Sequence, residues 1–204
     1  MFKNDDDRYL QINDVSGADL AEMWGDIKLN YATYEKWICY HNYLDIPDAV
    51  LSKLGATLED DSVEMRLAVG GINKSETSGV VQITEDNFNE FAILHAKRNP
   101  ENGANSERIR RNFSRWGIFV MLVDNKISDY IVIFIGHPAQ AEIFCVEASS
   151  IETGKKLIAF AAKYAFDNAK NEVLFMADEG TIPYDAALAI GFNITGFYKG
   201  FRVQ

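Results

Sequence analysis

Ala186-Ala-Leu-Ala-Ile-Gly-Phe192, followed closely by Ile194-Thr-Gly-Phe-Tyr198, is the stretch that decides the fold. The apolar residues after Pro183 predict a short helix that runs to the Gly-Phe pair. From Gly191 to Val203 the chain is rich in aromatic and β-branched side chains, which favours a strand. The sequence therefore predicts a short helix that passes directly into the last strand.

Upstream of this stretch, helical and strand-like segments follow one another in a clear order. Apolar runs, hairpin residues and amphipathic periods predict the following elements: strand 80–84, helix 87–97, a helix capped by Asn105 or Ser106 and running to about 114, strands 117–123 and 130–135 joined by a hairpin turn at 124–128, strand 141–147, a long helix 151–169 and strand 172–177. The predicted order is strand, two helices, three strands, long helix, strand, short helix, strand.

The first 79 residues have a different pattern. Apolar residues at three- and four-residue spacing predict a helix over 16–43, with an aromatic stripe that includes Tyr34 and Trp37. Pro47 and Gly55 bound a short helix, and strict alternation over 62–69 predicts a half-buried strand. The polar residues 70–79 form either a long hairpin loop or a domain linker. We therefore expect two domains, an α+β region over 1–78 and a second domain over 79–204.

Composition limits the classes of function. The formal net charge is −10, and most of it lies in residues 1–79, so we expect no nucleic-acid partner because an acidic surface repels phosphates. The acidic region favours either solubility or attraction of a cationic amine. No segment has the composition of a secretion signal or of a membrane span, and both cysteines lie in apolar runs. The sequence predicts a soluble cytoplasmic protein with free thiols and no membrane partner.

Three stretches together resemble the GNAT superfamily of N-acetyltransferases. Ala141-Glu-Ile-Phe-Cys-Val146 resembles the family's fourth strand, and Gly154-Lys-Lys-Leu-Ile158 resembles the start of the helix after the cofactor loop. The third stretch, from Ala186 through Gly191-Phe192 to Tyr198, resembles the family's closing helix and strand. The resemblance implies an α/β fold with a mixed sheet, a GNAT-like acyl-CoA N-acyltransferase with an N-terminal α+β extension. It further implies transfer of an acetyl group from acetyl-CoA to a primary amine of a small molecule or peptide. The sequence leaves the oligomeric state open, with a homodimer as one possibility.

The cofactor loop departs from the family's pattern. The family has Gln/Arg-x-x-Gly-x-Gly/Ala, whereas this chain has Ser149-Ser-Ile-Glu-Thr-Gly154, in which only the last glycine matches. Ser149-x-x-Glu152 is typical of a capping box, and a carboxylate there would take the place of a phosphate at the helix start. The resemblance nonetheless implies a donor-binding set on the fourth strand and the loop: Phe144, Cys145, Val146, Ser149, Thr153, Gly154, Lys155 and Lys156.

The catalytic residues implied by the resemblance are a glutamate and a tyrosine. Glu142 is the candidate base on the fourth strand, and Glu147 is the alternative. Ala187 stands where the family has the tyrosine that protonates the thiolate, so Tyr184, one helical turn earlier, is the candidate acid. The histidines are scattered without the spacing of metal ligands, so the sequence predicts no metal site.

Two other functions stay open at this point. One is a catalytically silent GNAT-like domain that binds a small molecule or a protein, which the altered loop favours. The other is a structural partner protein, whose contact surface would be the aromatic helix around Trp37.

Overall fold

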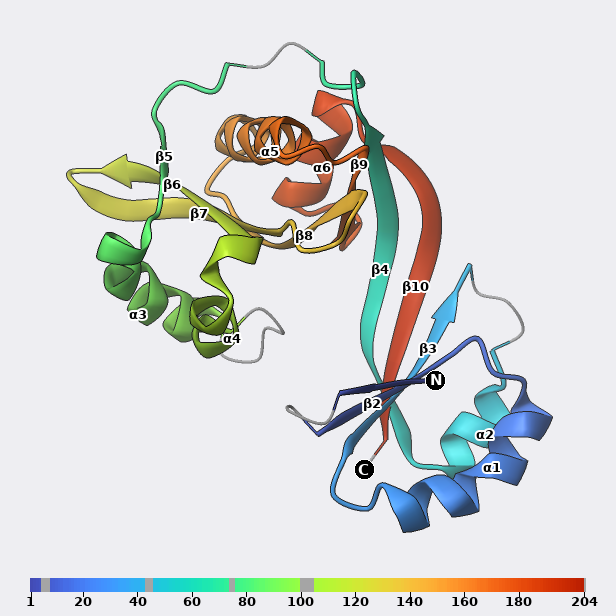
Figure 1. The fold of residues 1–204 in the computed structure, drawn as a ribbon. Coiled ribbons are helices and arrows are strands. Elements are labelled where there is room, and N and C mark those ends of the chain that lie inside the picture. The colour runs from blue at the N-terminus through green and yellow to red at the C-terminus, as the bar shows by residue number, and fades with distance from the viewer. Residues whose placement is uncertain (5–7, 43–45, 74–75, 100–104, 204) are drawn as a thin grey trace. The chain divides into compact units, whose positions relative to one another are not determined.

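The computed structural model describes residues 1–4, 8–42, 46–73, 76–99 and 105–203. The chain forms two compact units (Figure 1). The first unit is Met1–Val63 together with Gly196–Gln204, and the second is Glu64–Thr195. The boundary at Val63/Glu64 lies upstream of the expected one at 78/79, and the last residues of the chain return to the first unit. Two long strands therefore contribute residues to both units.

The first unit is a sheet with two helices. Its elements are β1 (Phe2–Asn4), β2 (Tyr9–Asn13), α1 (Gly17–Asn30), β3 (Glu35–His41), α2 (Asp48–Lys53), the first part of β4 (Ala56–Ala68) and the end of β10 (Asn193–Val203). The strands lie in the order β1-β2-β3-β10-β4. Both helices pack on the face that presents Leu10, Ile12 and Ile38, and their side chains Trp24 and Leu51 complete one core cluster.

The helix predicted over 16–43 is wrong in its second half. Helix α1 ends at Asn30, and residues 35–41 form β3. β3 pairs in parallel with β2 and antiparallel with Tyr198–Val203 of β10. Of the aromatic residues that mimic a helical period, Trp37 and Tyr40 lie in β3, where a spacing of three places them on opposite faces of the sheet. Tyr40 is buried in the core beside Phe201, and Trp37 is half-buried. The helix around Trp37 that a structural partner would contact does not exist.

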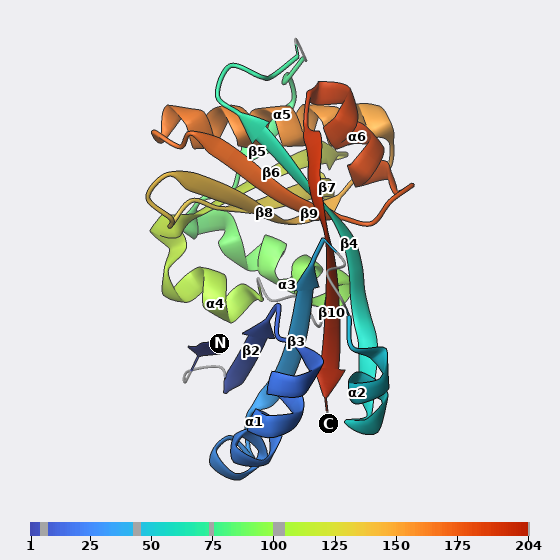
Figure 2. The same ribbon diagram turned by 90° about the vertical axis from the view of Figure 1, so that its right-hand side faces the viewer.

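The second unit contains the remaining elements and a larger sheet. They are β5 (Val80–Gln82), α3 (Phe88–Arg98), α4 (Ser106–Arg111), β6 (Trp116–Val123), β7 (Lys126–Phe134), β8 (Gln140–Glu147), α5 (Ile151–Asp167), β9 (Glu172–Ala177) and α6 (Ile182–Ile190), with the 3-10 turns η1 (Glu85–Asn87) and η2 (Phe113–Arg115). The strands lie in the order β10-β4-β9-β8-β7-β6-β5. Helices α5 and α6 cover one face of this sheet, and α3 and α4 cover the other (Figures 1 and 2).

The predicted order of elements from residue 80 to the C-terminus is confirmed. The hairpin between β6 and β7 turns at Asp124 and Asn125, whose φ angles are 51° and 59°, as the tight two-residue turn requires. Asn105 caps α4 by accepting a hydrogen bond from the Arg108 amide, although α4 ends at Arg111 rather than near residue 114. No helix in the described part of the chain is both long and apolar enough to span a bilayer.

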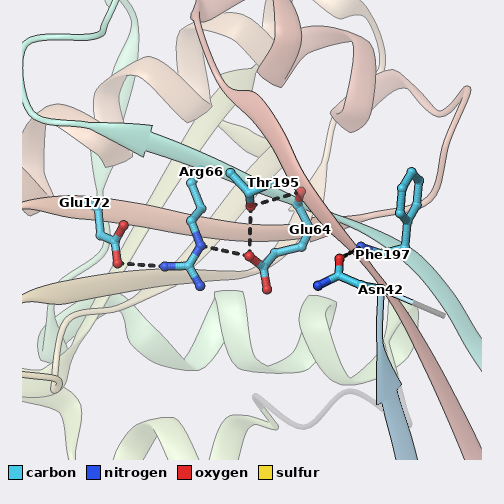
Figure 3. Close-up of polar contacts among 6 residues, drawn as sticks. All are labelled: Asn42, Glu64, Arg66, Glu172, Thr195 and Phe197. Carbon is cyan, nitrogen blue, oxygen red and sulfur yellow. Dashed lines mark hydrogen bonds and ion pairs between the residues drawn. The ribbon is translucent and has the colours of Figure 1, made fainter. Parts of the chain in front are cut away.

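The sheet of the second unit includes a strand that precedes the predicted domain. β4 lies between β9 and β10 and is tied to both by side chains (Figure 3). Arg66 of β4 donates at 2.8 Å to Glu64 on its own strand and at 2.8 Å to Glu172 of β9. Thr195 of β10 donates at 2.8 Å to Glu64. In the first unit, the Phe197 amide of β10 donates to Asn42 Oδ1 at 3.3 Å.

Residues after β4 pack against α6 within the second unit. The Asn73 amide donates to the carbonyl of Ile190 at 2.9 Å, so it satisfies a free carbonyl at the end of α6. Gly191 ends α6 with φ 112°, and a Cβ at this position would lie 2.5 Å from the carbonyl oxygen of Gly71. The segment expected as a hairpin loop or linker is therefore a connection between β4 and β5 that is packed against α6 in its first part.

Candidate active site

The centre of the second unit's sheet opens where β8 and β9 separate. These parallel strands are paired from Gln140↔Glu172 to Ile143↔Phe175, yet β8 continues to Glu147 and β9 to Ala177. Beyond the last pair a cleft of about 280 Å³ opens between them. It is lined by Asn99, Phe144, Cys145, Val146, Glu147, Phe175, Met176, Ala177, Asp178, Thr181 and Pro183. The facing strand edges lack ladder partners there, so their backbone groups are open to an extended ligand.

A β-bulge explains why the strands separate at this point. On the other side of β8, Val132 of β7 pairs with Cys145 and Ile133 pairs with Ile143, which leaves Phe144 as the extra residue. A bulge bends its strand and interrupts the ladder. The bulge therefore lies next to the last β8–β9 pair, and it places Phe144 at the wall of the cleft.

Glu147 is the carboxylate at the end of β8, and it is held by a polar cluster of Asn99, Tyr130 and His95. Asn99, at the end of α3, donates from Nδ2 to Glu147 Oε1 at 3.2 Å and to the Tyr130 hydroxyl at 2.7 Å. His95 Nδ1 lies 3.1 Å from the same hydroxyl, and the His95 and Tyr130 side chains are fully buried. Because these bonds join α3, β7 and β8, they fix the carboxylate at the cleft.

Cys145 lies on the wall of the cleft, and its thiol stays protonated at neutral pH. Burial raises the pKa of its thiol to about 12, and the Glu147 charge adds to the rise. Since the thiolate is the nucleophilic form, Cys145 is not a nucleophile at neutral pH. Cys145 lines the cleft together with Phe144 and Val146, the other β8 residues of the predicted donor-binding set.

The predicted catalytic pair of Glu142 and Tyr184 is not brought together at the cleft. Glu142 is half-buried on β8; burial raises the pKa of its carboxyl group, and Arg108 opposes the rise. Tyr184 is 8% exposed on α6, where its neighbours Thr181 and Pro183 line the cleft. Neither Glu142 nor Tyr184 is among the described residues that line it. Glu147, the alternative base, does line the cleft.

The start of α5 differs from the capping box that the sequence suggested. The cap is Ser150, whose hydroxyl accepts from the Thr153 amide at 3.2 Å. The Ser149 amide instead donates to Asp129 of β7, a carboxylate that is 5% exposed. Glu152 is 76% exposed and pairs with Lys155 at 2.8 Å rather than with the cap. The prediction fails because Asp129, distant in sequence, takes the amide of Ser149 and places the cap one residue later.

The two predicted phosphate-binding lysines both face carboxylates. Lys155 pairs with Glu152, and Lys156 Nζ lies 3.4 Å from Glu76. Such exposed pairs are weak and open readily. The charge of each lysine is nevertheless matched by that of its carboxylate, so each pair adds no net charge near the start of α5.

Gly154 is a packing residue between two helices. It is buried in α5, and a Cβ there would lie 2.9 Å from the Cβ of Ala186 in α6. Gly154→Ala is expected to destabilise the protein by about 1–3 kcal/mol, because overpacking outweighs alanine's better helix propensity. Ala186→Gly, made in addition, removes the facing methyl group and should restore most of the loss in urea unfolding. Additive losses in the double variant would contradict the contact.

The described residues contain no group of three or more His, Cys, Asp or Glu side chains that could hold a metal ion. The cleft combines strand edges without ladder partners, the Glu147 carboxylate held by Asn99, and the start of α6 at Thr181 and Pro183. Such edges can pair with an extended ligand that carries amide groups, and a carboxylate can accept a proton.

Comparison with known structures identifies the fold. A GCN5-related N-acetyltransferase from Kribbella flavida superposes with TM-score 0.68 at 12% identity, over 94% of this chain and 77% of that one. A putative GNAT-family acetyltransferase from Novosphingobium aromaticivorans gives 0.60 at 13% identity, over 83% and 74%. N-myristoyltransferase from Saccharomyces cerevisiae, solved with bound myristoyl-CoA, gives 0.54 at 10% identity, over 89% and 54%.

No family model and no curated protein sequence matches the chain. The structural matches share little sequence identity, so they establish the fold alone. The fold is the GNAT acyltransferase fold, a mixed α/β sheet with helices on its faces, as the sequence predicted.

Proposed function

We propose that the chain is an N-acyltransferase that transfers an acetyl group from acetyl-CoA to a primary amine of a small molecule or peptide. The observation that carries this proposal is the cleft between β8 and β9, with Glu147 at its wall. An extended arm that bears amide groups can pair with two unpaired strand edges, as an added strand does. The pantetheine arm of coenzyme A is such a ligand.

The residues of the cleft suit the donor arm. Phe144, Cys145 and Val146 offer the backbone of β8, and Met176 and Ala177 offer that of β9. Backbone N–H groups at the bulge are the candidate donors to the thioester oxygen, which becomes negative as the amine attacks. The start of α5, from Ser149 to Gly154, follows directly on β8 and is the candidate position for the phosphates.

The reaction needs a base and a proton for the leaving thiolate. The amine nitrogen attacks the thioester carbon, the C–N bond forms, and the C–S bond breaks. Glu147 takes the proton that the nitrogen loses. The departing thiolate takes up a proton and leaves as the free thiol of coenzyme A, so the reaction has no net gain or loss of protons. Glu147 is proposed for the base over Glu142 because it lines the cleft and is held by Asn99. Tyr184 remains a proposal for the thiolate acid.

Binding of acetyl-CoA tests the proposal. At 100 times its dissociation constant the donor should add about 2.7 kcal/mol of stability, because it binds only the folded protein. For a chain of this size that corresponds to a rise of about 5–10 °C in Tm. A saturable rise in differential scanning fluorimetry, followed by thiol release when amines are added, is the expected result. No change in Tm at millimolar acetyl-CoA would contradict the proposal.

The altered start of α5 favours a second candidate, a GNAT-fold domain that binds a ligand without turning it over. Here Asp129 and Glu152 add negative charge where phosphates would lie. This candidate predicts donor binding in the cleft without thiol release for any amine. The thiol-release assay separates the two.

A further inference from the structure

We infer that the cleft recognises its acyl donor through the uncharged pantetheine arm, with little affinity contributed by the nucleotide phosphates, and that Asp129 is the residue that sets this preference. The inference rests on the proposed function and names the part of the donor that the site recognises. It follows from the charges around the cleft and the start of α5.

Asp129 already supplies a negative charge at the start of α5. One carboxylate oxygen accepts the Ser149 amide, and the other accepts the Ser128 hydroxyl at 2.6 Å. The side chain is 5% exposed, so its position is fixed and its charge is poorly screened by water. Since a helix N-terminus favours one nearby anion, the internal carboxylate reduces what an incoming phosphate can gain there.

The cations near the same helix start do not outnumber the carboxylates. Lys155 and Lys156 face Glu152 and Glu76, so these four side chains sum to zero. Arg98 donates to the Ser128 carbonyl at 2.9 Å and so adds one positive charge beside Asp129. With Asp129 and Glu147 included, the sum is −1. This balance holds whether or not the exposed pairs are closed at a given moment, because the charges stay in place.

The cleft itself has the same sign. Glu147 and Asp178 are the charged side chains among the described residues that line it, and no lysine or arginine does so. A ligand with several phosphates therefore gains no electrostatic attraction from the residues that line the cleft. The unpaired backbone edges of β8 and β9 match the amides of pantetheine, and Phe144, Phe175 and Val146 supply apolar contact.

The test compares two donors, acetyl-CoA and acetyl-pantetheine, by isothermal titration at 50 and 200 mM salt. We expect dissociation constants within about tenfold of each other and weak dependence on salt, since few phosphate contacts form. Binding of acetyl-CoA that is more than about tenfold tighter than that of acetyl-pantetheine would overturn this inference and leave the proposed function intact. Binding of neither donor would overturn both.

Asp129→Asn isolates the charge. Asparagine keeps an oxygen that accepts the Ser149 amide, so the loop should hold its shape while the negative charge is lost. Acetyl-CoA should bind about three- to tenfold tighter, which is the size of one charge at a helix start, and acetyl-pantetheine should bind as before. Asp124→Asn, in the turn between β6 and β7, removes the same charge elsewhere and should change neither donor. Unchanged or weaker acetyl-CoA binding in a folded Asp129→Asn protein would contradict the assignment.

Discussion

Glu147→Gln is expected to lower kcat/KM for acyl transfer by about 100-fold or more, the usual contribution of a positioned general base. Glutamine keeps the shape of the side chain and an oxygen that can accept from Asn99, but it cannot take a proton from the attacking amine. The loss should fall on kcat, while the affinity for the donor stays within about threefold. Steady-state thiol release and donor titration measure the two quantities.

Glu142→Gln is the matched control on the same strand. It makes the same chemical change two residues before the bulge, at a side chain that does not line the cleft. Its effect on kcat should be less than about threefold. A larger loss in Glu142→Gln than in Glu147→Gln would return the role of base to Glu142.

Gly191→Ala is expected to have the largest effect on stability, a loss of roughly 2–4 kcal/mol in the free energy of unfolding. The residue holds φ 112°, which strains any side chain, and its Cβ would lie 2.5 Å from the Gly71 carbonyl oxygen. The junction of α6, β10 and the segment after β4 would have to shift. Urea denaturation with matched m-values measures the loss.

Gly180→Ala separates the two causes. Gly180 also has a positive φ, 77°, but a Cβ there meets no atom within 4 Å. Its loss should be about 1–2 kcal/mol, the conformational cost alone. Equal losses at Gly180 and Gly191 would show that the contact with Gly71 contributes nothing.

The order of elements in the second unit could be predicted because each element has a local signal. The Asp124–Asn125 turn, the Asn105 cap and the long amphipathic period of α5 are all short-range features. The failures come from pairing at long range. Residues 35–41 become a strand only because β2 and β10 flank them, and β4 joins the second unit only through β9 and β10.

The cleft wall on β8 could be anticipated, whereas the residues that shape its chemistry could not. Phe144, Cys145 and Val146 were expected to bind the donor, and they line the cleft. Asn99 and Asp129 gave no signal, because they act through hydrogen bonds to residues 20 or more positions away. Gly154 is the residue of this stretch that matches the family's loop. In the structure it lets α5 pack closely against Ala186 of α6.

Hydrogen exchange with and without saturating acetyl-CoA tests the central claim most directly, since that claim places the donor between β8 and β9. Exchange reports the opening of backbone amides segment by segment. We predict slower exchange over residues 144–153 and 175–178, with the first unit's strands β2 and β3 unchanged. Protection confined to the first unit, or none at donor concentrations that saturate binding, would contradict the account.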